Sequence, residues 1–403
     1  MLSKRKIIND PVYGFITISH PLIFDILSHP YYQRLRRIHQ MALAQLVYPG
    51  AVHTRLHHSL GAYHLMCNAV NELRYKNVDI SPEEETAVKA AILLHDIGHG
   101  PFSHALEHTL VSGVHHEELS LMIMHEMNDQ MDGRLQLALD IFNGNYAKPF
   151  LYQLISGQLD VDRMDYLTRD SFFTGVNEGV IGYDRILKMF TVHNDQLMIE
   201  EKGIYSVEKF LIARRQMYWQ VYLHKAVLAA EKMLVKIVER VKAIYSDDDI
   251  RLCTNSPLDY FLGSFNGNMD KESLELFCNM DDDDMMFAIK RWSNHPDIVL
   301  STLCKGILNR RLLKCHLHDN PVNEEALERL KEKVAIQLGI SVEEASFLVF
   351  SGEAVNTIYT SDDEQILVHF KDGTVKNISQ VYNPLIHQTI STPVKKFYIC
   401  ELK

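Results

Sequence analysis

The stretch LLHDIGHGPFSH, residues 93–104, places four titratable side chains behind a run of isoleucine and leucine: His95, Asp96, His99 and His104. Imidazole nitrogens and carboxylate oxygens together suit a divalent cation of borderline hardness. A single histidine beside apolar residues is more often a hydrogen-bonded structural side chain than a ligand. For the set the balance reverses, because each buried polar group without a partner costs about 1–3 kcal/mol. The stretch therefore predicts a metal site.

Two further donors lie on neighbouring predicted helices. His58 belongs to RLHHSLG and Asp162 to DVDRMDY. If both helices pack against the one that ends at His95, two imidazoles and two aspartates converge on one ion. Such a ligand set accepts Fe, Mn, Mg or Zn, and the residue types do not choose among these metals.

The helices that must position these donors are indicated by spacing and caps. Ser81 and Glu84 are spaced as a capping box, and apolar residues then recur at helical spacing as far as His95. A glycine- and proline-containing segment interrupts the pattern after that residue. Two more helices are expected at 54–74 and 158–170.

Composition and charge argue against several classes of protein. No apolar run is long enough to cross a membrane and no signal-like segment begins the chain, so we expect a cytoplasmic protein without a membrane partner. Six cysteines without a CxxC pair argue against a zinc ribbon or a disulfide framework. A net charge of −11 makes a stable nucleic-acid partner unexpected, because such binding uses a broad basic surface. The acidic run Asp281–Asp284 is interpreted as a solvated loop.

The fold class is predicted as mainly α with a small α+β C-terminal region. The segment 206–241 lacks glycine and proline and is the longest predicted helix. Towards the C-terminus one more helix is expected at 323–339, and a hairpin turn at 371–373. Short β-rich runs surround that turn, at 364–370, 374–381 and 395–402. We therefore predict a helical catalytic body at 1–319 and a second region at 320–403.

Several motifs occur in one order and together resemble a known family. HSLG, LLHDIGHGPFSH and DVDRMDY are similar to the HD-domain metal-dependent phosphohydrolases. The segments YPGAVHTRLHHSLG, HHEELS and YLHK look like the deoxynucleoside triphosphate triphosphohydrolases of the SAM-and-HD-domain type, here without a SAM domain. The resemblance is dense over residues 4–245 and weak beyond. It implies an HD-domain helical bundle.

The resemblance implies roles for the residues near the predicted metal site. His58, His95, Asp96 and Asp162 match the metal ligands, and the spacing to SLG favours His58 over His57.

The same resemblance assigns catalytic roles around the HD motif. His104 matches the histidine that gives a proton to the leaving oxygen, and His99 matches one that lines the phosphates. Glu107 could orient the His104 imidazole from one helical turn away. His116 and Glu117 resemble a family pair near the catalytic centre, with an exposed loop pair as the alternative.

Cations are expected around a triphosphate. Arg55 precedes His58 on one helix face, and Arg163 follows the Asp162 ligand directly. Further along the chain, Arg214 shares a helical stripe with two tyrosines, Tyr218 and Tyr222. On spacing alone, a surface arginine beside packed aromatics is an equal alternative, and the resemblance favours nucleotide contact for Arg214 and Tyr222.

Selection of deoxyribose is implied by three residues. Tyr166 would pack under the sugar and block a 2′-hydroxyl, whereas Asp170 and Gln40 would hold the 3′-hydroxyl. Tyr166 could also be an ordinary core aromatic. Tyr218 stands where a relative has histidine, so base preference does not carry over.

An activating-nucleotide site is implied in altered form. Ser28 replaces an aspartate that recognises an activating guanine in a relative. The residues that match the rest of that site are Lys6, Ile7, Asn9, Gln33 and Arg36.

The expected activity is metal-dependent hydrolysis of deoxynucleoside triphosphates to deoxynucleoside and inorganic triphosphate. This expectation includes possible activation of the reaction by a nucleotide. The alternatives are an HD phosphohydrolase acting on a monophosphate, a cyclic dinucleotide or a guanosine polyphosphate, and a nucleotide-sensing module. Relatives assemble through the helical body and C-terminal region, so a homodimer or homotetramer is expected.

Overall fold

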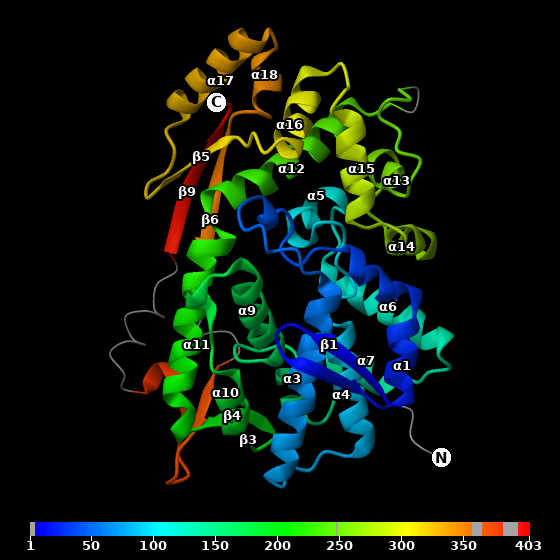
Figure 1. Ribbon diagram of the computed structural model, residues 1–403, viewed down its shortest axis with the longest axis vertical. Coiled ribbons are helices and arrows are strands. Elements are labelled where there is room, and N and C mark those ends of the chain that lie inside the picture. Colours follow the sequence, from blue (N-terminus) through cyan, green and yellow to red (C-terminus); the bar gives the residue numbers. More distant parts are fainter. Residues whose placement is uncertain (1–4, 247–248, 357–364, 382–393) are drawn as a thin grey trace.

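The computed structural model describes residues 5–246, 249–356, 365–381 and 394–403. The described chain is mainly helical, with small sheets at its periphery, which confirms the predicted fold class (Figure 1). The helices of the N-terminal half are α1 Pro21–Ser28, α2 Pro30–Gln33, α3 Arg55–Tyr75, α4 Pro82–Leu94, α5 Glu107–Leu110, α6 His116–Gln130, α7 Gln136–Phe142, α8 Pro149–Gln153, α9 Val161–Thr174 and α10 Tyr183–Met189. Those of the C-terminal half are α11 Ile204–Met217, α12 Lys225–Ile244, α13 Leu258–Gly263, α14 Lys271–Cys278, α15 Asp282–Trp292, α16 Ile298–Leu308, α17 Glu324–Leu338 and α18 Val342–Ala345. The strands are β1 Lys6–Asp10, β2 Gly14–Ile18, β3 Phe190–His193, β4 Gln196–Glu200, β5 Lys314–His318, β6 Phe350–Asn356, β7 Leu367–His369, β8 Val375–Asn377 and β9 Val394–Glu401.

Helix α3 packs against both α4 and α9. The capping box predicted at the start of α4 is confirmed: Ser81 accepts from the Glu84 amide, and the Glu84 carboxylate accepts from the Ser81 amide. The helix ends one residue before His95. Alanine and leucine side chains of α3 and α4 are almost completely buried against each other. Tight packing of this kind fixes the relative positions of the helix ends.

A glycine allows α9 to approach α3 closely. Any Cβ at Gly61 would collide with the carboxylate of Asp165 and the guanidinium of Arg169. The predicted helix at 158–170 begins three residues later than expected, because Asp160 is extended and caps it by accepting from the Arg163 amide at 2.6 Å.

The expectation of one continuous helix over 206–241 is wrong. Residues Tyr218–Tyr222 form a π-helical turn, which separates α11 from α12. His224 then has an extended ψ of 127°, and its side chain caps α12 by accepting from the Ala226 amide. The absence of glycine and proline did not reveal this break, because a histidine supplies the cap.

The acidic run Asp281–Asp284 is not a solvated loop. Asp281 caps α15, and Asp284 completes a capping box by accepting from the Asp281 amide at 2.9 Å. Acidic side chains stabilise a helix N-terminus because they face unpaired amides and the positive end of the helix dipole. Asp282, the first residue of α15, has only 2% of its surface exposed.

Two sheets join the C-terminal segments to the helical body. Strand β7 pairs in parallel with β4 and forms a hairpin with β8, as predicted, with Gly373 at φ 84° in the turn. Strand β9 lies between β5 and β6. The first residue of the predicted run 364–370 lies outside the described residues. Both sheets thus contain strands from each side of residue 319, and the division at that point stays a prediction.

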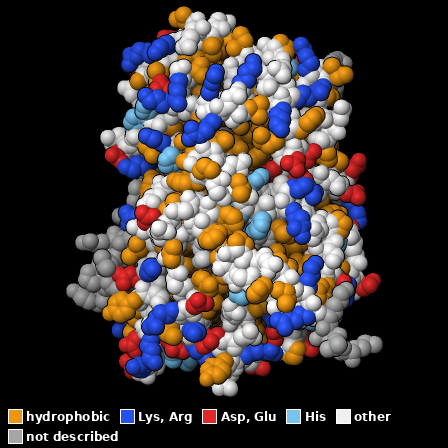
Figure 2. All heavy atoms as spheres, viewed as in Figure 1, with side chains coloured by type: hydrophobic (Ala, Val, Ile, Leu, Met, Phe, Trp, Pro, Cys, Tyr) orange, Lys and Arg blue, Asp and Glu red, His pale blue; other side chains and the backbone are white. Residues whose placement is uncertain are grey.

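The remaining expectations concern cysteines and membranes. All six cysteines are free. Within the described residues, no helix has both the length and the hydropathy needed to cross a bilayer. On the face seen in Figure 2, Lys and Arg side chains gather over the upper third, whereas acidic and basic side chains are interspersed lower down.

Candidate metal centre and substrate cavity

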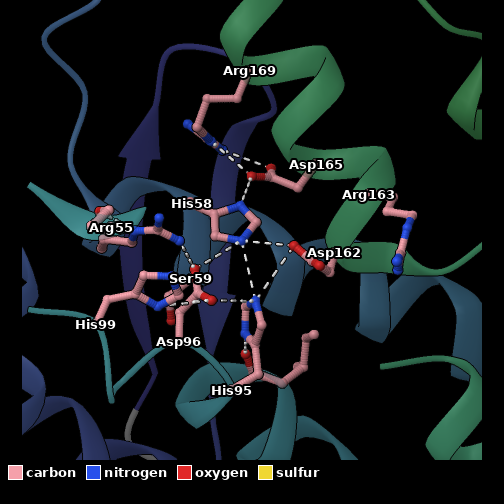
Figure 3. Close-up of polar contacts among 12 residues, drawn as sticks. Arg55, His58, Ser59, His95, Asp96, His99, Asp162, Arg163, Asp165 and Arg169 are labelled. Atoms are coloured by element: carbon pink, nitrogen blue, oxygen red, sulfur yellow. Dashed lines mark hydrogen bonds and ion pairs between the residues drawn. The ribbon is translucent and has the colours of Figure 1, made fainter. Parts of the chain in front are cut away.

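Four side chains from three segments meet at the ends of α3, α4 and α9 (Figure 3). Nε2 of His58 lies 3.2 Å from Nε2 of His95 and 3.0 Å from Oδ1 of Asp162. The Asp96 carboxylate lies 3.5 Å from the first imidazole and 3.4 Å from the second. Donor atoms at these separations fit around a single divalent ion. The structure therefore brings together all four residues predicted as metal ligands.

The hydrogen bonds behind the two imidazoles fix which nitrogen faces the cluster. Nδ1 of His58 donates to Oδ2 of Asp165 at 2.7 Å, and Nδ1 of His95 donates to the carbonyl of Ile92 at 2.7 Å. Each ring therefore turns Nε2 toward the centre, which is the nitrogen that would bind a metal. This donor set fits a divalent cation.

His58 is completely buried among carboxylates. Burial disfavours its charged form, but hydrogen bonds to Asp162 and Asp165 outweigh burial and raise the pKa of His58 to about 10. A cation that takes the Nε2 lone pair must therefore displace a proton, so metal binding should weaken as the pH falls.

Asp96 is held in place by an arginine. Nη1 of Arg55 donates to Oδ2 of Asp96 at 2.5 Å, and Nε donates to Oγ of Ser103 at 2.9 Å. Burial alone would raise the pKa of Asp96, but Arg55 and the surrounding imidazoles hold it well below its usual range. The carboxylate is thus ionised and correctly oriented for a cation.

A second cluster of histidines adjoins the first. Nε2 of His99 lies 3.4 Å from Nε2 of His104, and the His99 and His116 rings are 4.2 Å apart between centroids. Glu107 bridges two of the rings, accepting from Nδ1 of His104 at 3.0 Å and from Nδ1 of His116 at 2.6 Å. Partial burial opposes its ionisation, but these hydrogen bonds hold the pKa of Glu107 well below its usual value.

The two clusters differ in chemistry. His99 is 1% exposed, and burial together with Arg55 lowers the pKa of His99 well below its usual value. Among the described residues its Nδ1 has no hydrogen-bond partner. The side chain of His104, in contrast, is 64% exposed. Either cluster could hold a cation by donor spacing, but only the first includes a carboxylate, and only the second includes an exposed side chain.

One cavity of about 440 Å³ opens onto both clusters. It reaches most of the residues predicted for catalysis and substrate binding. Those that line it are Gln40, Arg55, Asp96, His99, His104, His116, Asp162, Tyr166, Asp170, Tyr218 and Tyr222. Its far wall is formed by α12, where Lys232 adds a cation.

The part of the cavity beyond the metal centre is lined by tyrosines and one carboxylate. Asp170 accepts from Nε2 of His53 and from the hydroxyl of Tyr222, both at 2.7 Å. The Tyr166 and Tyr222 rings are 6.4 Å apart between centroids. Within the described chain, Oε1 of Gln40 is buried without a hydrogen-bond partner. The cavity therefore offers an amide oxygen that a hydroxyl could satisfy.

Four residues predicted for catalysis or substrate binding do not line this cavity: Glu107, which binds the His104 and His116 rings, and Arg163, Arg214 and Glu117. Arg163 pairs with Asp160 and points away from the metal centre (Figure 3). Arg214 is buried, with Nη1 donating to Gln158 at 3.1 Å. Glu117 is exposed on α6 and lines none of the cavity.

The residues predicted for an activating nucleotide lie at the N-terminal end. Lys6, Ile7 and Asn9 are exposed on β1. Nε of Arg36 donates to Oε1 of Gln33 at 2.7 Å. This site stays a prediction.

Sequence reasoning missed the residues that orient the ligands. Asp165 holds His58, and Arg169 in turn pairs with both Asp165 and Asp10. The signal was present: Asp165 lies three residues after Asp162, and therefore on the same helix face. No local pattern indicated Asp10, which comes from the N-terminal hairpin.

Comparison with known proteins identifies the family. Residues 55–170 match the HD domain, and residues 181–255 match the HD associated region. A phosphohydrolase from Bacteroides thetaiotaomicron, known from its crystal structure, is 49% identical; the match has a TM-score of 0.94 and covers 99% of this chain and 100% of that one. The chain belongs to the HD-domain phosphohydrolases.

Other relatives of this HD-domain phosphohydrolase are more distant. The uncharacterized protein YwfO of Bacillus subtilis is 32% identical over 392 residues, which cover 94% of this chain and 88% of that protein. The deoxynucleoside triphosphate triphosphohydrolase SAMHD1 homolog of Dictyostelium discoideum is 29% identical over 250 residues, which cover 57% of this chain and 48% of that protein. HD domains bind divalent metals, and the cluster at His58, His95 and Asp162 has the composition for one.

Removal of one ligand tests the metal centre. We expect His58→Ala and Asp162→Ala to lower bound metal at least about tenfold, because each removes a donor that the remaining residues do not replace. Metal content is measured by inductively coupled plasma mass spectrometry after dialysis.

His57→Ala is the matched control for the His58 variant. Nδ1 of His57 contacts Thr54 at its backbone amide and hydroxyl, away from the cluster. This variant should keep wild-type metal content. Equal loss from the two variants would contradict the assignment of His58.

The partner behind His58 gives a second prediction. Asp165→Asn leaves one acceptor oxygen where His58 and Arg169 now use two, so the imidazole is held less firmly. The metal dissociation constant should rise about 10-fold to 100-fold, measured by competition with a fluorescent chelator. An unchanged constant in a variant with wild-type thermal stability would show that Asp165 does not support the ligand.

Proposed function

We propose that this HD-domain phosphohydrolase hydrolyses deoxynucleoside triphosphates to deoxynucleosides and inorganic triphosphate in a metal-dependent reaction. The observation that carries the proposal is one cavity that joins the His/Asp cluster, His104 and the Tyr166, Asp170 and Gln40 side chains. A phosphate site alone would serve many substrates. A hydrogen-bonding, tyrosine-lined compartment beside it has the chemistry to hold a sugar.

The metal cluster defines where the phosphorus must lie. When bound, a divalent cation supplies Lewis acidity to phosphoryl oxygens and lowers the pKa of water. Arg55 lines the same wall and offsets negative charge while it holds Asp96. His99 lines this region with a neutral ring, so it can hydrogen-bond a phosphate oxygen. Lys232 places a further positive charge in the cavity.

His104 is the general acid in this proposal. The departing 5′-oxygen is a poor leaving group as an alkoxide and needs a proton when the bond to the α-phosphorus breaks. Glu107 accepts from Nδ1 of His104, which leaves Nε2 to face the cavity and give up its proton. Because Glu107 also holds His116, the two imidazoles are oriented by one carboxylate.

The sugar compartment supports a deoxyribose. Tyr166 lies in the wall where a 2′-hydroxyl would need space, and Asp170 and Gln40 present acceptors for a 3′-hydroxyl. On the family resemblance we also propose that the metal is Fe, Mn, Mg or Zn. We further propose activation by a nucleotide and assembly as a homodimer or homotetramer.

A product assay tests the proposal directly. Purified protein incubated with each deoxynucleoside triphosphate and Mn²⁺ or Mg²⁺ should release deoxynucleoside and intact triphosphate, resolved by ion-exchange chromatography. His104→Ala should lower kcat about 10²-fold to 10⁴-fold while keeping its metal, because only the proton donor is lost.

Other outcomes of the same assay point to other functions. Orthophosphate alone would indicate another phosphohydrolase, active on a monophosphate, a cyclic dinucleotide or a guanosine polyphosphate. Binding without turnover would indicate a nucleotide sensor. Either result overturns the proposal.

Discrimination between sugars gives a separate prediction. Tyr166→Ala opens the wall of the sugar compartment, so the ratio of kcat/KM for dGTP over GTP should fall at least about tenfold, equivalent to 1.4 kcal/mol. Tyr63→Phe, a change at a tyrosine of α3 outside the cavity, serves as the control. An unchanged ratio in Tyr166→Ala would contradict the role given to Tyr166.

A further inference from the structure

The loop between α4 and α5 carries two of the proposed catalytic histidines and is conformationally demanding. Phe102 and Ser103 adopt left-handed φ angles of 55° and 52°. Left-handed conformations in residues other than glycine cost about 1–3 kcal/mol each and persist only where the surroundings enforce them. Something must therefore hold this loop in the conformation that presents His99 and His104.

The carboxylate of Asp282 supplies that restraint. Oδ1 accepts from the Phe102 amide at 2.7 Å. Oδ2 accepts from the His39 amide at 2.8 Å and from Nδ1 of His39 at 2.6 Å. Asp282 is 2% exposed, so these donors meet an ionisable group that water barely reaches.

The same turn of the chain holds the start of the loop through a buried arginine. Arg34, 1% exposed, donates to the carbonyl of Met280 at 2.8 Å. Its other two groups donate to the carbonyls of Ile97 at 3.2 Å and His99 at 2.6 Å. The segment Met280–Asp282 therefore holds the loop at both ends.

A chain of hydrogen bonds continues from His39 to the metal centre. The carbonyl of His39 accepts from Oγ of Ser103 at 3.1 Å, and Oγ accepts from Nε of Arg55 at 2.9 Å. Arg55 then orients Asp96. A shift of the loop would consequently displace Ser103 and His104 directly, whereas Asp96 is connected to the loop only through Arg55.

We propose that Asp282 is a positioning residue that sets the conformation of the 98–104 loop and thereby the placement of His104 as proton donor. The inference rests on the proposed function only in the role of His104. Residue 282 lies outside both family segments, 55–170 and 181–255, so it gives a task to a part of the chain that the family match leaves without one.

Asp282→Asn and Asp283→Asn form a matched pair of test variants. In Asp282→Asn the new side chain has a single acceptor oxygen. Its amide nitrogen would therefore face a hydrogen-bond donor of either Phe102 or His39. Asp283 is the exposed neighbour on the same helical turn, and its replacement changes the same charge.

Hydrogen–deuterium exchange measures the loop itself, without any substrate. In Asp282→Asn, exchange in peptides covering 98–104 should accelerate at least about tenfold, whereas peptides from α3 and α9 should exchange as in the wild type. Asp283→Asn should leave all of these peptides unchanged. Unchanged loop exchange in Asp282→Asn would overturn the proposal.

A leaving-group comparison separates positioning of His104 from a general loss of structure. When a p-nitrophenyl phosphodiester is cleaved, p-nitrophenolate departs without needing a proton, whereas the 5′-oxygen of a deoxynucleoside needs one. Asp282→Asn should lower kcat at least about tenfold for the deoxynucleoside triphosphate and less than about threefold for the p-nitrophenyl ester, with KM and metal content nearly constant. Equal losses on both substrates would overturn the proposal, since a merely structural role affects both.

Two further controls keep the test decisive. If Asp282→Asn does not fold, Asp282→Glu keeps the charge but moves the carboxylate by one methylene, and it should show the same selective loss to a smaller degree. A wild-type protein that cleaves the p-nitrophenyl ester but no deoxynucleoside triphosphate would refute the proposed substrate, and loop exchange alone would then decide the role of Asp282.

Discussion

A completely buried imidazole that must keep one nitrogen free is the constraint on which the rest of the structure depends. His58 faces Asp162 and His95 with Nε2 and Asp165 with Nδ1. Such a ring would be costly in an apolar core, and the surrounding carboxylates are what make it tolerable. Those carboxylates need their own partners, which is why Arg169 is buried beside them. The polar network is therefore satisfied as a unit rather than residue by residue.

The packing of the helices follows from this network. A side chain at Gly61 would prevent α9 from approaching α3, and Asp165 would then be too far from His58. Similarly, a Cβ at Gly98 would collide with the backbone of His116 and Ser120, so α6 could not reach the 98–104 loop. Small residues at helix contacts thus set the geometry of ligands that lie several residues away. Rigid elements hold the cation ligands, while His104 is on a loop that needs separate support.

The sequence predicted the parts of the molecule that depend on local pattern. The capping box of α4, the mainly helical class and the C-terminal hairpin follow from spacing within a few residues. The break at Tyr218–Tyr222 was missed because a π-turn has no compositional signature. The buried position of Asp282 was missed because an acidic run has the same sequence pattern whether it caps a helix or faces water. Partners distant in sequence, such as Asp10 for Arg169, required the fold.

The most direct test of the central claim is an anomalous-difference map from crystals soaked in Mn²⁺. One ion should appear about 2.0–2.3 Å from Nε2 of both His58 and His95, with Asp96 and Asp162 completing its ligands. An ion held instead between His99, His104 and His116, with no density beside His58, would contradict the account.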